Sequence, residues 1–361
     1  MNEPLSRFAA RLRGRIEQLP ASALAAALPD FPRLALELFA LQFAANPAYQ
    51  TICRARQRTP ETVVDWTQIP FVPTTAFKEL ELSCLLPAGR TAVFHSSGTT
   101  EQKPSRHFHG PESLALYEAS LWRWFEPRFP GANQFLFLTP TLAAAPHSSL
   151  VHMFDAVRKK AGSGEFLGRI GGDGAWTVDF AAATGRLESA VGQGRPLVLL
   201  GTAFSFVHLL DFLAENKITF KLPEHSRVME TGGYKNRSRT MPKSELHRLI
   251  TNRLGIGRER IICEYGMSEL SSQAYDAALD RESPARHFHF PPWARAQIIS
   301  PETGREVEDG ETGLIRVLDL ANAFSVAAIQ TEDLAIRRGE GFELLGRAQQ
   351  AEPRGCSLMS A

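Results

Sequence analysis

The feature that most constrains the fold is a regular alternation of short apolar runs and amphipathic stretches between residues 91 and 266. The apolar runs are expected to be strands, and the stretches with apolar residues at i, i+3 and i+4 are expected to be helices. Strands alternating with helices predict an α/β fold with a largely parallel sheet. The predicted strands are 91–97, 133–140, 195–202, 226–233 and 259–266, and the predicted helices are 112–129, 148–161, 203–216 and 241–255.

The two ends of the chain have sequence patterns that differ from this alternation. Residues 31–46 carry apolar positions at helical spacing, and residues 294–320 read as two strands joined by Pro/Gly turns. We therefore expect a helical N-terminal region, an α/β core that closes with a β-rich subdomain, and a short mobile tail. The expected divisions are 1–70 for the helical region, 71–347 for the core with its β-rich part at about 290–347, and 348–361 for the tail.

Charge and cysteine content exclude several classes of protein. The 40 basic and 39 acidic side chains leave no global field for nucleic acid or an anionic membrane. The longest apolar run, 197–210, is too short to span a bilayer and contains Gly, Thr, Ser and His. The 4 cysteines are far apart without a C-x-x-C pair, and no secretory signal opens the chain. These features predict a cytoplasmic protein with no nucleic-acid partner and no membrane span.

Ligands of α/β sheets gather at the carboxyl ends of the strands, so the loops there are the candidate sites. The first loop, "FHSSGTTEQKPSRH", places small hydroxyl residues around a glycine and is followed by Lys103. Exposed backbone N–H groups in such a loop can surround phosphate oxygens. An ordinary turn has the same composition, and Lys103 lacks the spacing of the GxxxxGK[ST] phosphate loop. The loop residues are Ser96, Ser97, Gly98, Thr99 and Thr100.

A second loop, "EYGMSEL", follows the last predicted strand of the alternating region. The aromatic ring of Tyr265, which is followed by Gly266, can stack on a nucleotide base, and the carboxylate of Glu269 can hold Mg²⁺. A helix N-cap at Ser268, with Glu269 favoured by the helix dipole, explains the same letters. Asp333 and the pair Gly346-Arg347 are each expected to follow a strand and are uninformative alone.

The joint order of SSGTT, YGMSE, TED and GR resembles the adenylate-forming superfamily, which includes acyl-CoA synthetases, peptide-synthetase adenylation domains and luciferases. Within it the chain most resembles the LuxE-type acyl-protein synthetases of the bacterial luminescence fatty-acid reductase complex. The phrases that carry this likeness are "IPFVPTTAFKE", "LLGTAFSFVHLLDFL", "METGGYKNRSR", "YGMSELSSQAYD", "PPWARAQII" and "GCSL". The resemblance implies the large N-terminal domain of these enzymes, with layered β-sheets flanked by helices and a β-rich subdomain. It also implies that their usual small C-terminal domain is lacking, since 14 residues follow Arg347.

The same resemblance implies ATP and Mg²⁺ as cofactors and assigns a role to each loop. The 96–100 loop and Lys103 would grip phosphate, although Glu101 stands where a second Gly is usual and the Lys-Pro order is inverted. Asp333 would bind the ribose hydroxyls and Arg347 the ribose-phosphate side. Gly232 and Gly233 would lie beside the adenine, and Tyr265, which precedes Gly266, would stack on the adenine ring. Ser268 would contact the α-phosphate, and Glu269 would ligate Mg²⁺.

Cys356 lies five residues before the last residue, after Arg354 and Gly355. By the resemblance, a fatty acid is activated as acyl-adenylate and then transferred to this thiol, with Arg354 favouring the thiolate. An acyl reductase is the implied protein partner. Two other hypotheses remain open: a ligase that loads coenzyme A or a carrier protein, as phenylacetate-CoA ligases do, and a non-catalytic subunit that binds acyl groups or nucleotide.

Two further patterns are weaker. Arg-His-Phe-His occurs at 106–109 and at 286–289, and on a strand the two histidines of each copy would share a face. No third ligand stands at a telling spacing, so a metal site there is disfavoured. Cys53, Cys84 and Cys263 lie in apolar or helical contexts and are expected to be inert core thiols.

Overall fold

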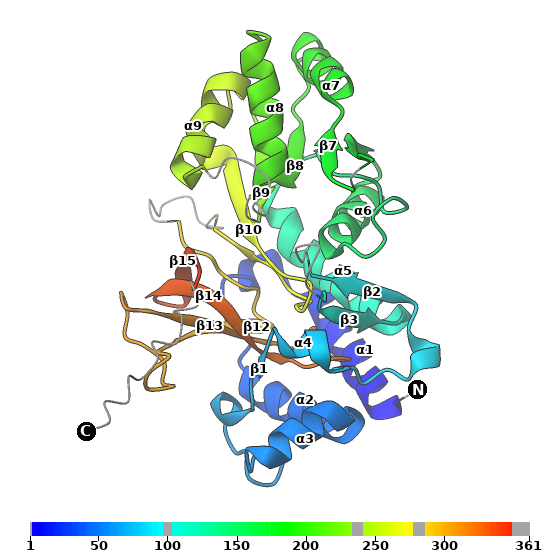
Figure 1. Ribbon diagram of the computed structural model, residues 1–361, viewed down its shortest axis with the longest axis vertical. Helices are drawn as coiled ribbons and strands as arrows, with labels where there is room; N and C mark the ends of the chain where they lie inside the picture. The colour runs from blue at the N-terminus through cyan, green and yellow to red at the C-terminus, as the bar shows by residue number, and fades with distance from the viewer. Residues whose placement is uncertain (1, 97–102, 173, 233–240, 277–285, 349–361) are drawn as a thin grey trace, which may run out of the picture.

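The computed structural model describes residues 2–96, 103–172, 174–232, 241–276 and 286–348. Its larger sheet has six strands in the order β11-β10-β9-β8-β4-β5, and all neighbouring pairs are parallel except β10–β11. This confirms the predicted α/β fold with a largely parallel sheet (Figure 1). The strands are β4 (Phe135–Phe137), β5 (Glu165–Phe166), β8 (Val198–Thr202), β9 (Arg227–Thr231), β10 (Ile261–Tyr265) and β11 (Ala274–Tyr275).

Helices join the strands of this sheet. Ser148 caps the N-terminus of α6 by accepting a hydrogen bond from the backbone N–H of Val151. Thr202 caps α8 in the same way, so the strand β8 runs directly into its helix. The helices are α5 (Pro111–Phe125), α6 (Ser149–Ala161), α7 (Phe180–Gln193), α8 (Ala203–Glu215) and α9 (Lys243–Leu254).

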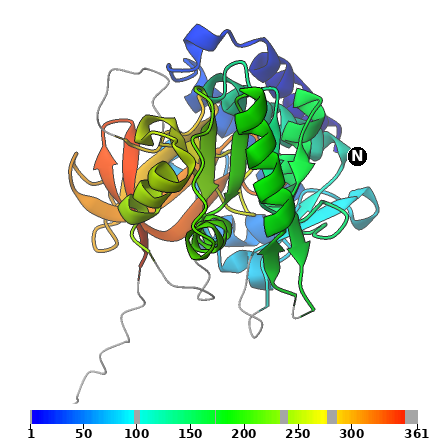
Figure 2. The same cartoon turned by 90° about the horizontal axis from the view of Figure 1, so that it is seen from above.

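A second sheet contains five strands in the order β1-β14-β13-β12, with β15 also paired to β14. This is the predicted β-rich part of the chain, except that its edge strand β1 comes from the N-terminal side. Seen from above, its red and orange strands lie on one side of the green segments, and the cyan hairpin of β2 and β3 lies on the other (Figure 2). The strands are β1 (Val72–Pro73), β12 (Ala294–Ile299), β13 (Thr312–Asp319), β14 (Ala328–Arg338) and β15 (Gly341–Arg347).

The remaining elements are two hairpins and the N-terminal helices. One hairpin, of β6 and β7, lies in a stretch for which the sequence predicts no strand. The hairpin strands are β2 (Ala92–His95), β3 (Arg106–His109), β6 (Gly168–Ile170) and β7 (Trp176–Val178). The helices are α1 (Glu3–Gln18), α2 (Phe31–Ala45), α3 (Pro47–Ala55) and α4 (Ala76–Glu79), with 3-10 turns at Ala21–Ala23, Trp66–Gln68, Pro87–Gly89, Glu126–Arg128 and Arg258–Arg260.

The buried strands contribute side chains to two apolar clusters, because successive residues of a strand point to opposite faces of the sheet. In β8, Val198 and Leu200 belong to one cluster of buried apolar residues, whereas Leu199 and its neighbour Leu197 belong to another. Because successive side chains point to opposite faces, a strand with apolar residues at every position must be covered on both faces. The first cluster also contains buried residues of α1, α2, β12 and β13, so the N-terminal helices share a core with the second sheet.

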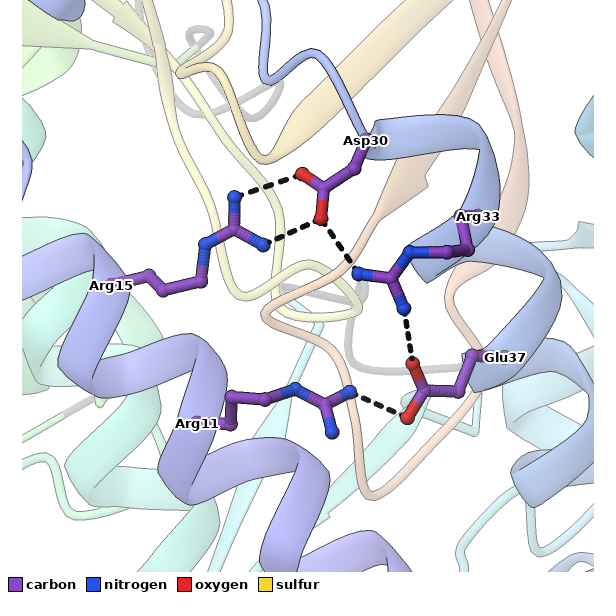
Figure 3. A network of polar contacts seen from close by, with 5 residues as sticks. All are labelled: Arg11, Arg15, Asp30, Arg33 and Glu37. Atoms are coloured by element: carbon purple, nitrogen blue, oxygen red, sulfur yellow. Dashed lines mark hydrogen bonds and ion pairs between the residues drawn. The ribbon is translucent and has the colours of Figure 1, made fainter.

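An ion-pair network ties α1 to the start of α2 (Figure 3). Arg15 makes a bidentate pair with the carboxylate of Asp30, with both N–O distances 2.8 Å. Arg33 lies between Asp30 and Glu37, at 2.7 and 3.3 Å, and Arg11 reaches Glu37 at 2.5 Å. Five charges that share partners hold the two helices in one geometry better than isolated surface pairs would.

Across the ranges given above, no helix combines the length and the apolar character needed to cross a membrane.

Candidate active site

The site begins where β9 and β10 end side by side. The two strands are parallel and Glu264 lies opposite Thr231, so the chain leaves both strands at the same level of the sheet. Gly232 follows β9 with a φ of 73°, in the left-handed region that favours glycine. A Cβ placed on Gly232 would meet no atom of the described residues within 4 Å. Within that part of the chain, the carboxyl end of β9 leaves room beside Gly232, and the ends of parallel strands are where ligand loops are expected.

Tyr265, the last residue of β10, links the two sheets. Its hydroxyl donates a 2.8 Å hydrogen bond to Oδ2 of Asp333 on β14. Its ring is 7% exposed and meets Phe342 edge-on, with ring centroids 5.5 Å apart. Burial raises the pKa of Tyr265, with Asp333 adding to the effect, so the phenol keeps its proton as a donor.

Asp333 and Arg347 face each other across the β14–β15 pair. Nε of Arg347 lies 3.9 Å from Oδ1 of Asp333, and the Arg347 side chain is 83% exposed. The structure corrects two expectations, because neither Asp333 nor the Gly346-Arg347 pair follows a strand. Asp333 lies inside β14, where the ladder with β15 shifts register after Leu334, and Gly346 and Arg347 are the last two residues of β15. The sequence does not reveal this because the β14 side chains are only partly buried here and lack a clean alternation.

Ser268 and Glu269 form the second part of the site. Both are buried, at 6% and 5% exposed, and the Ser268 hydroxyl donates a 2.9 Å hydrogen bond to Oε2 of Glu269. The Ser105 hydroxyl lies 3.5 Å from that of Ser268, and the backbone N–H of Ser105 donates to Oγ of Ser96. The base of the Ser/Thr/Gly loop is thereby connected to Glu269 through two serines.

Lys103 lies on the surface beside α4, where its ammonium is 3.4 Å from a carboxylate oxygen of Glu79. The other loop residues and the tail cysteine fall outside the described residues. These are Ser97, Gly98, Thr99, Thr100, Gly233 and Cys356.

Sequence reasoning missed a buried carboxylate that supports the 266–273 loop. Asp319, at the end of β13, accepts hydrogen bonds from the backbone N–H of Ser271 and from the hydroxyl of Ser272. Its side chain is fully buried, and burial raises its pKa to about 6. Asn322 donates a 2.9 Å hydrogen bond to the backbone carbonyl of Glu269. The only signal in the sequence is an acid and an amide within an otherwise apolar stretch, "VLDLANAF".

Glu264 is a second missed residue. It lies in β10 between Cys263 and Tyr265, and it accepts a short hydrogen bond from the Thr231 hydroxyl. Burial raises its pKa to about 7. A Cβ on Gly266 would lie 2.3 Å from Oε1 of Glu264, so any other residue there would have to displace the Glu264 carboxylate. A glutamate inside the apolar strand "IICEY" is the signal that could have found it.

These residues fit a nucleotide and a magnesium ion by their chemistry. The carboxylates of Asp333 and Glu269 both present oxygen atoms as ligands. Asp333 lies beside Tyr265, and Glu269 lies beside Ser268. Oxygen ligands suit Mg²⁺, and a carboxylate suits the paired hydroxyls of a ribose. Glu269 is the residue that would hold the ion.

Among solved structures, the chain is similar in fold to adenylate-forming ligases. A 2-hydroxyisobutyryl-CoA ligase bound to its acyl-adenylate matches with a TM-score of 0.65 and 13% identity, covering 92% of this chain and 70% of that one. A long-chain-fatty-acid-CoA ligase from Archaeoglobus fulgidus matches with a TM-score of 0.50 and 15% identity, covering 72% of this chain and 52% of that one. These likenesses show the fold.

Sequence comparison identifies the family. A long-chain-fatty-acid–luciferin-component ligase of Aliivibrio fischeri is 23% identical over 349 residues, covering 91% of this chain and 87% of that relative. The protein of the same name from Vibrio harveyi is 21% identical over 190 residues, covering 50% of this chain and 49% of that relative. The family model described as "Acyl-protein synthetase, LuxE" matches residues 172–361, which carry Tyr265, Glu269, Asp333 and Arg347. The chain belongs to the LuxE family of acyl-protein synthetases and is a ligase with the fold of the adenylate-forming enzymes.

Proposed function

We propose that this protein activates a fatty acid with ATP to give acyl-adenylate and pyrophosphate, and then transfers the acyl group to its own Cys356. The observation that carries the first step is the hydrogen bond between Tyr265 and Asp333, which joins the carboxyl end of β10 in one sheet to β14 in the other. The relatives named long-chain-fatty-acid–luciferin-component ligases favour a long-chain fatty acid as the substrate. The sequence resemblance to the acyl-protein synthetases of a fatty-acid reductase complex favours an acyl reductase as the protein that receives the acyl group.

In the first step a carboxylate oxygen of the acid attacks the α-phosphorus of ATP, and the bond between that phosphorus and the bridging oxygen of pyrophosphate breaks. Two anions must meet, so charge neutralisation and positioning supply most of the rate. Mg²⁺, held by Glu269, would neutralise charge on the phosphates. Asp333 accepts hydrogen bonds from the ribose, Ser268 donates to the α-phosphate, and Tyr265 lies against the adenine.

The second step needs a thiol that can become a thiolate. Burial raises the pKa of Cys53 to about 11 and that of Cys84 to about 12. Burial, with Glu230 and Asp276, also raises the pKa of Cys263. These three buried thiols are poor nucleophiles, which leaves Cys356 as the candidate among the 4 cysteines. The Cys356 thiolate attacks the acyl carbonyl, AMP leaves, and a thioester forms. We assign residues 348–361 as the segment that presents this thiol.

Exchange of labelled pyrophosphate into ATP, with a panel of carboxylic acids, tests the first step. Glu269→Gln keeps the shape of the side chain and removes the charge that holds Mg²⁺, so exchange is expected to fall by about a hundredfold or more. Glu302→Gln, on the surface, is the matched control and should exchange as the wild type does. Full exchange activity in Glu269→Gln would contradict the assignment of this residue.

Loading with radioactive fatty acid tests the second step. Cys356→Ala should still exchange pyrophosphate but should take up no label, whereas Ser357→Ala, its neighbour, should load normally. Wild-type label should be released by neutral hydroxylamine and map to the C-terminal peptide. Label that persists in Cys356→Ala would exclude this acceptor, and product formation that depends on coenzyme A would instead favour an acyl-CoA ligase.

A further inference from the structure

A second group of chemically reactive side chains lies behind the proposed nucleotide loops. Glu230 of β9 and Cys263 of β10 are direct register partners, so their side chains leave the same face of the sheet. His247 of α9 reaches the same place. Glu230 and His247 are each 4% exposed, and Cys263 is 1% exposed. One carboxylate, one thiol and one imidazole from three elements therefore share one buried position.

The two distances from His247 match ligands of a common central ion better than they match well-directed hydrogen bonds. Nε2 of His247 lies 3.5 Å from Oε1 of Glu230 and 3.6 Å from Sγ of Cys263. A tetrahedral zinc with bonds of about 2.0–2.3 Å separates its ligand atoms by roughly 3.3–3.8 Å. A single ring nitrogen cannot serve as a well-directed partner of both side chains at once. The three ligand atoms all lie within 4.8 Å of one another.

The charge of the group also calls for a cation. A buried carboxylate is stable only when it is paired or coordinated. Zn²⁺ with one thiolate, one carboxylate and one neutral imidazole is a site with no net charge, and this mixture of soft and intermediate ligands suits zinc. On binding, the ion replaces the thiol proton of Cys263, which is released to water.

The group also has an entry path. His247 lines a cavity of about 430 Å³, together with Lys243, Asp276 and His287. A water molecule from this cavity can complete a tetrahedral site that has three protein ligands.

We propose that Glu230, His247 and Cys263 bind one zinc ion, with water from the adjoining cavity as the fourth ligand. Glu230 lies two residues before Gly232, and Cys263 lies two residues before Tyr265. The ion thus ties β9, β10 and α9 together directly behind the proposed adenine loops. Its role in positioning those loops rests on the proposed function, whereas the binding of zinc does not.

The rival occupant is the ammonium of Lys243. Its Nζ lies 4.8 Å from the ring centroid of Phe288, beside the same group. Burial lowers the pKa of Lys243, but Cys263 and Glu230 outweigh that effect and raise it overall. If the ammonium is the permanent counter-ion, the protein needs no metal and Lys243→Met should lower its melting temperature. If zinc is the counter-ion, Lys243→Met removes a repelling charge and should bind zinc at least as tightly as the wild type.

Metal content of the tag-free, full-length protein, measured without nucleotide, tests the proposal independently of activity. Elemental analysis after dialysis should find about one zinc per chain, and replacement by Co²⁺ should give the near-ultraviolet charge-transfer band of a thiolate ligand. His247→Gln and Cys263→Ser should lose the metal. The controls Cys84→Ser, a buried thiol elsewhere, and His289→Gln should keep it.

Wild-type protein that takes up neither ion, or metal retained in both His247→Gln and Cys263→Ser, would overturn the proposal. Circular dichroism shows whether each variant folds. If the two ligand variants do not fold, the charge-transfer band of the wild type and zinc binding by Lys243→Met decide the question. Absence of that band would also overturn thiolate ligation.

Discussion

Lowering the pH from about 7.5 to about 5 is expected to destabilise the fold through two buried histidines of β3, His107 and His109. Both side chains point to the same face of the strand, as the sequence predicted, and their ring centroids are 4.2 Å apart. Nδ1 of His107 lies 2.7 Å from the backbone carbonyl oxygen of Ser268, to which a neutral ring donates. Among the residues that the structure describes, neither ring nitrogen of His109 has a hydrogen-bond partner.

The sign of the effect follows from the pKa shifts. Burial lowers the pKa of His107 to about 4, and burial with the neighbouring His107 and His152 lowers that of His109 well below its ordinary value. Below pH 6.5 the unfolded chain therefore takes up protons that the folded chain refuses, so stability is lost as the pH falls. For His107 alone, a shift from 6.5 in the unfolded chain to about 4 in the fold amounts to about 2 kcal/mol at pH 5.

His107→Asn isolates this contribution because its amide can donate to the Ser268 carbonyl and cannot take a charge. The free energy of unfolding, from urea titration at each pH, is the measurement. Between about pH 7.5 and pH 5 the wild type should lose about 2 kcal/mol more than the variant. His225→Asn, at an exposed residue with a φ of 72° that asparagine accepts, controls for removal of a surface histidine. Equal losses in wild type and His107→Asn would refute the reasoning.

Three other predictions concern the site and the fold. Asp333→Ala should weaken ATP binding by more than tenfold in calorimetry, because hydrogen bonds to a charged group are worth about 1.5–3 kcal/mol each, while Asp309→Ala, on an exposed turn, should not. Gly266→Ala should weaken ATP binding as well, since its Cβ would lie 2.3 Å from Oε1 of Glu264, and unchanged affinity would contradict the close packing. Asp30→Asn should lower the free energy of unfolding at neutral pH by about 1 kcal/mol. The hydrogen bond from Arg15 lowers the pKa of Asp30, so this contribution is present above about pH 4, and wild type and variant should converge as the pH falls below it.

The elements that the sequence located well are those whose pattern is local. The series from β8 to β10 lies within the predicted strands and helices, because a fully apolar strand next to an amphipathic helix has few other readings. The pairing of Val72 with Ile329 could not be predicted, because it joins segments far apart along the chain and because the strand β1 has only two residues. Trp176 and its hairpin were missed because the strands are short and half exposed.

The candidate site was predictable where residue identity implies chemistry and not where it depends on neighbours. Tyr265 and Asp333 were predicted as site residues from a resemblance, and their mutual hydrogen bond was not expected. The grouping of Glu230, His247 and Cys263 rests on the register of two strands and on the face that α9 covers. None of these relations leaves a pattern of spacing in the sequence, because each is set by packing across the fold.

The N-terminal helices are part of what holds the site. Gln42 of α2 is 1% exposed; its amide donates to the backbone carbonyl of Asn322 and accepts from the backbone N–H of Ala327. Asn322 in turn donates to the carbonyl of Glu269, the residue assigned to Mg²⁺. A buried amide with every partner in place is costly to disturb, because each group left unpaired loses about 1–3 kcal/mol. Helix α2 therefore fixes the turn after β13, and that turn fixes the backbone of Glu269, the residue proposed to hold Mg²⁺.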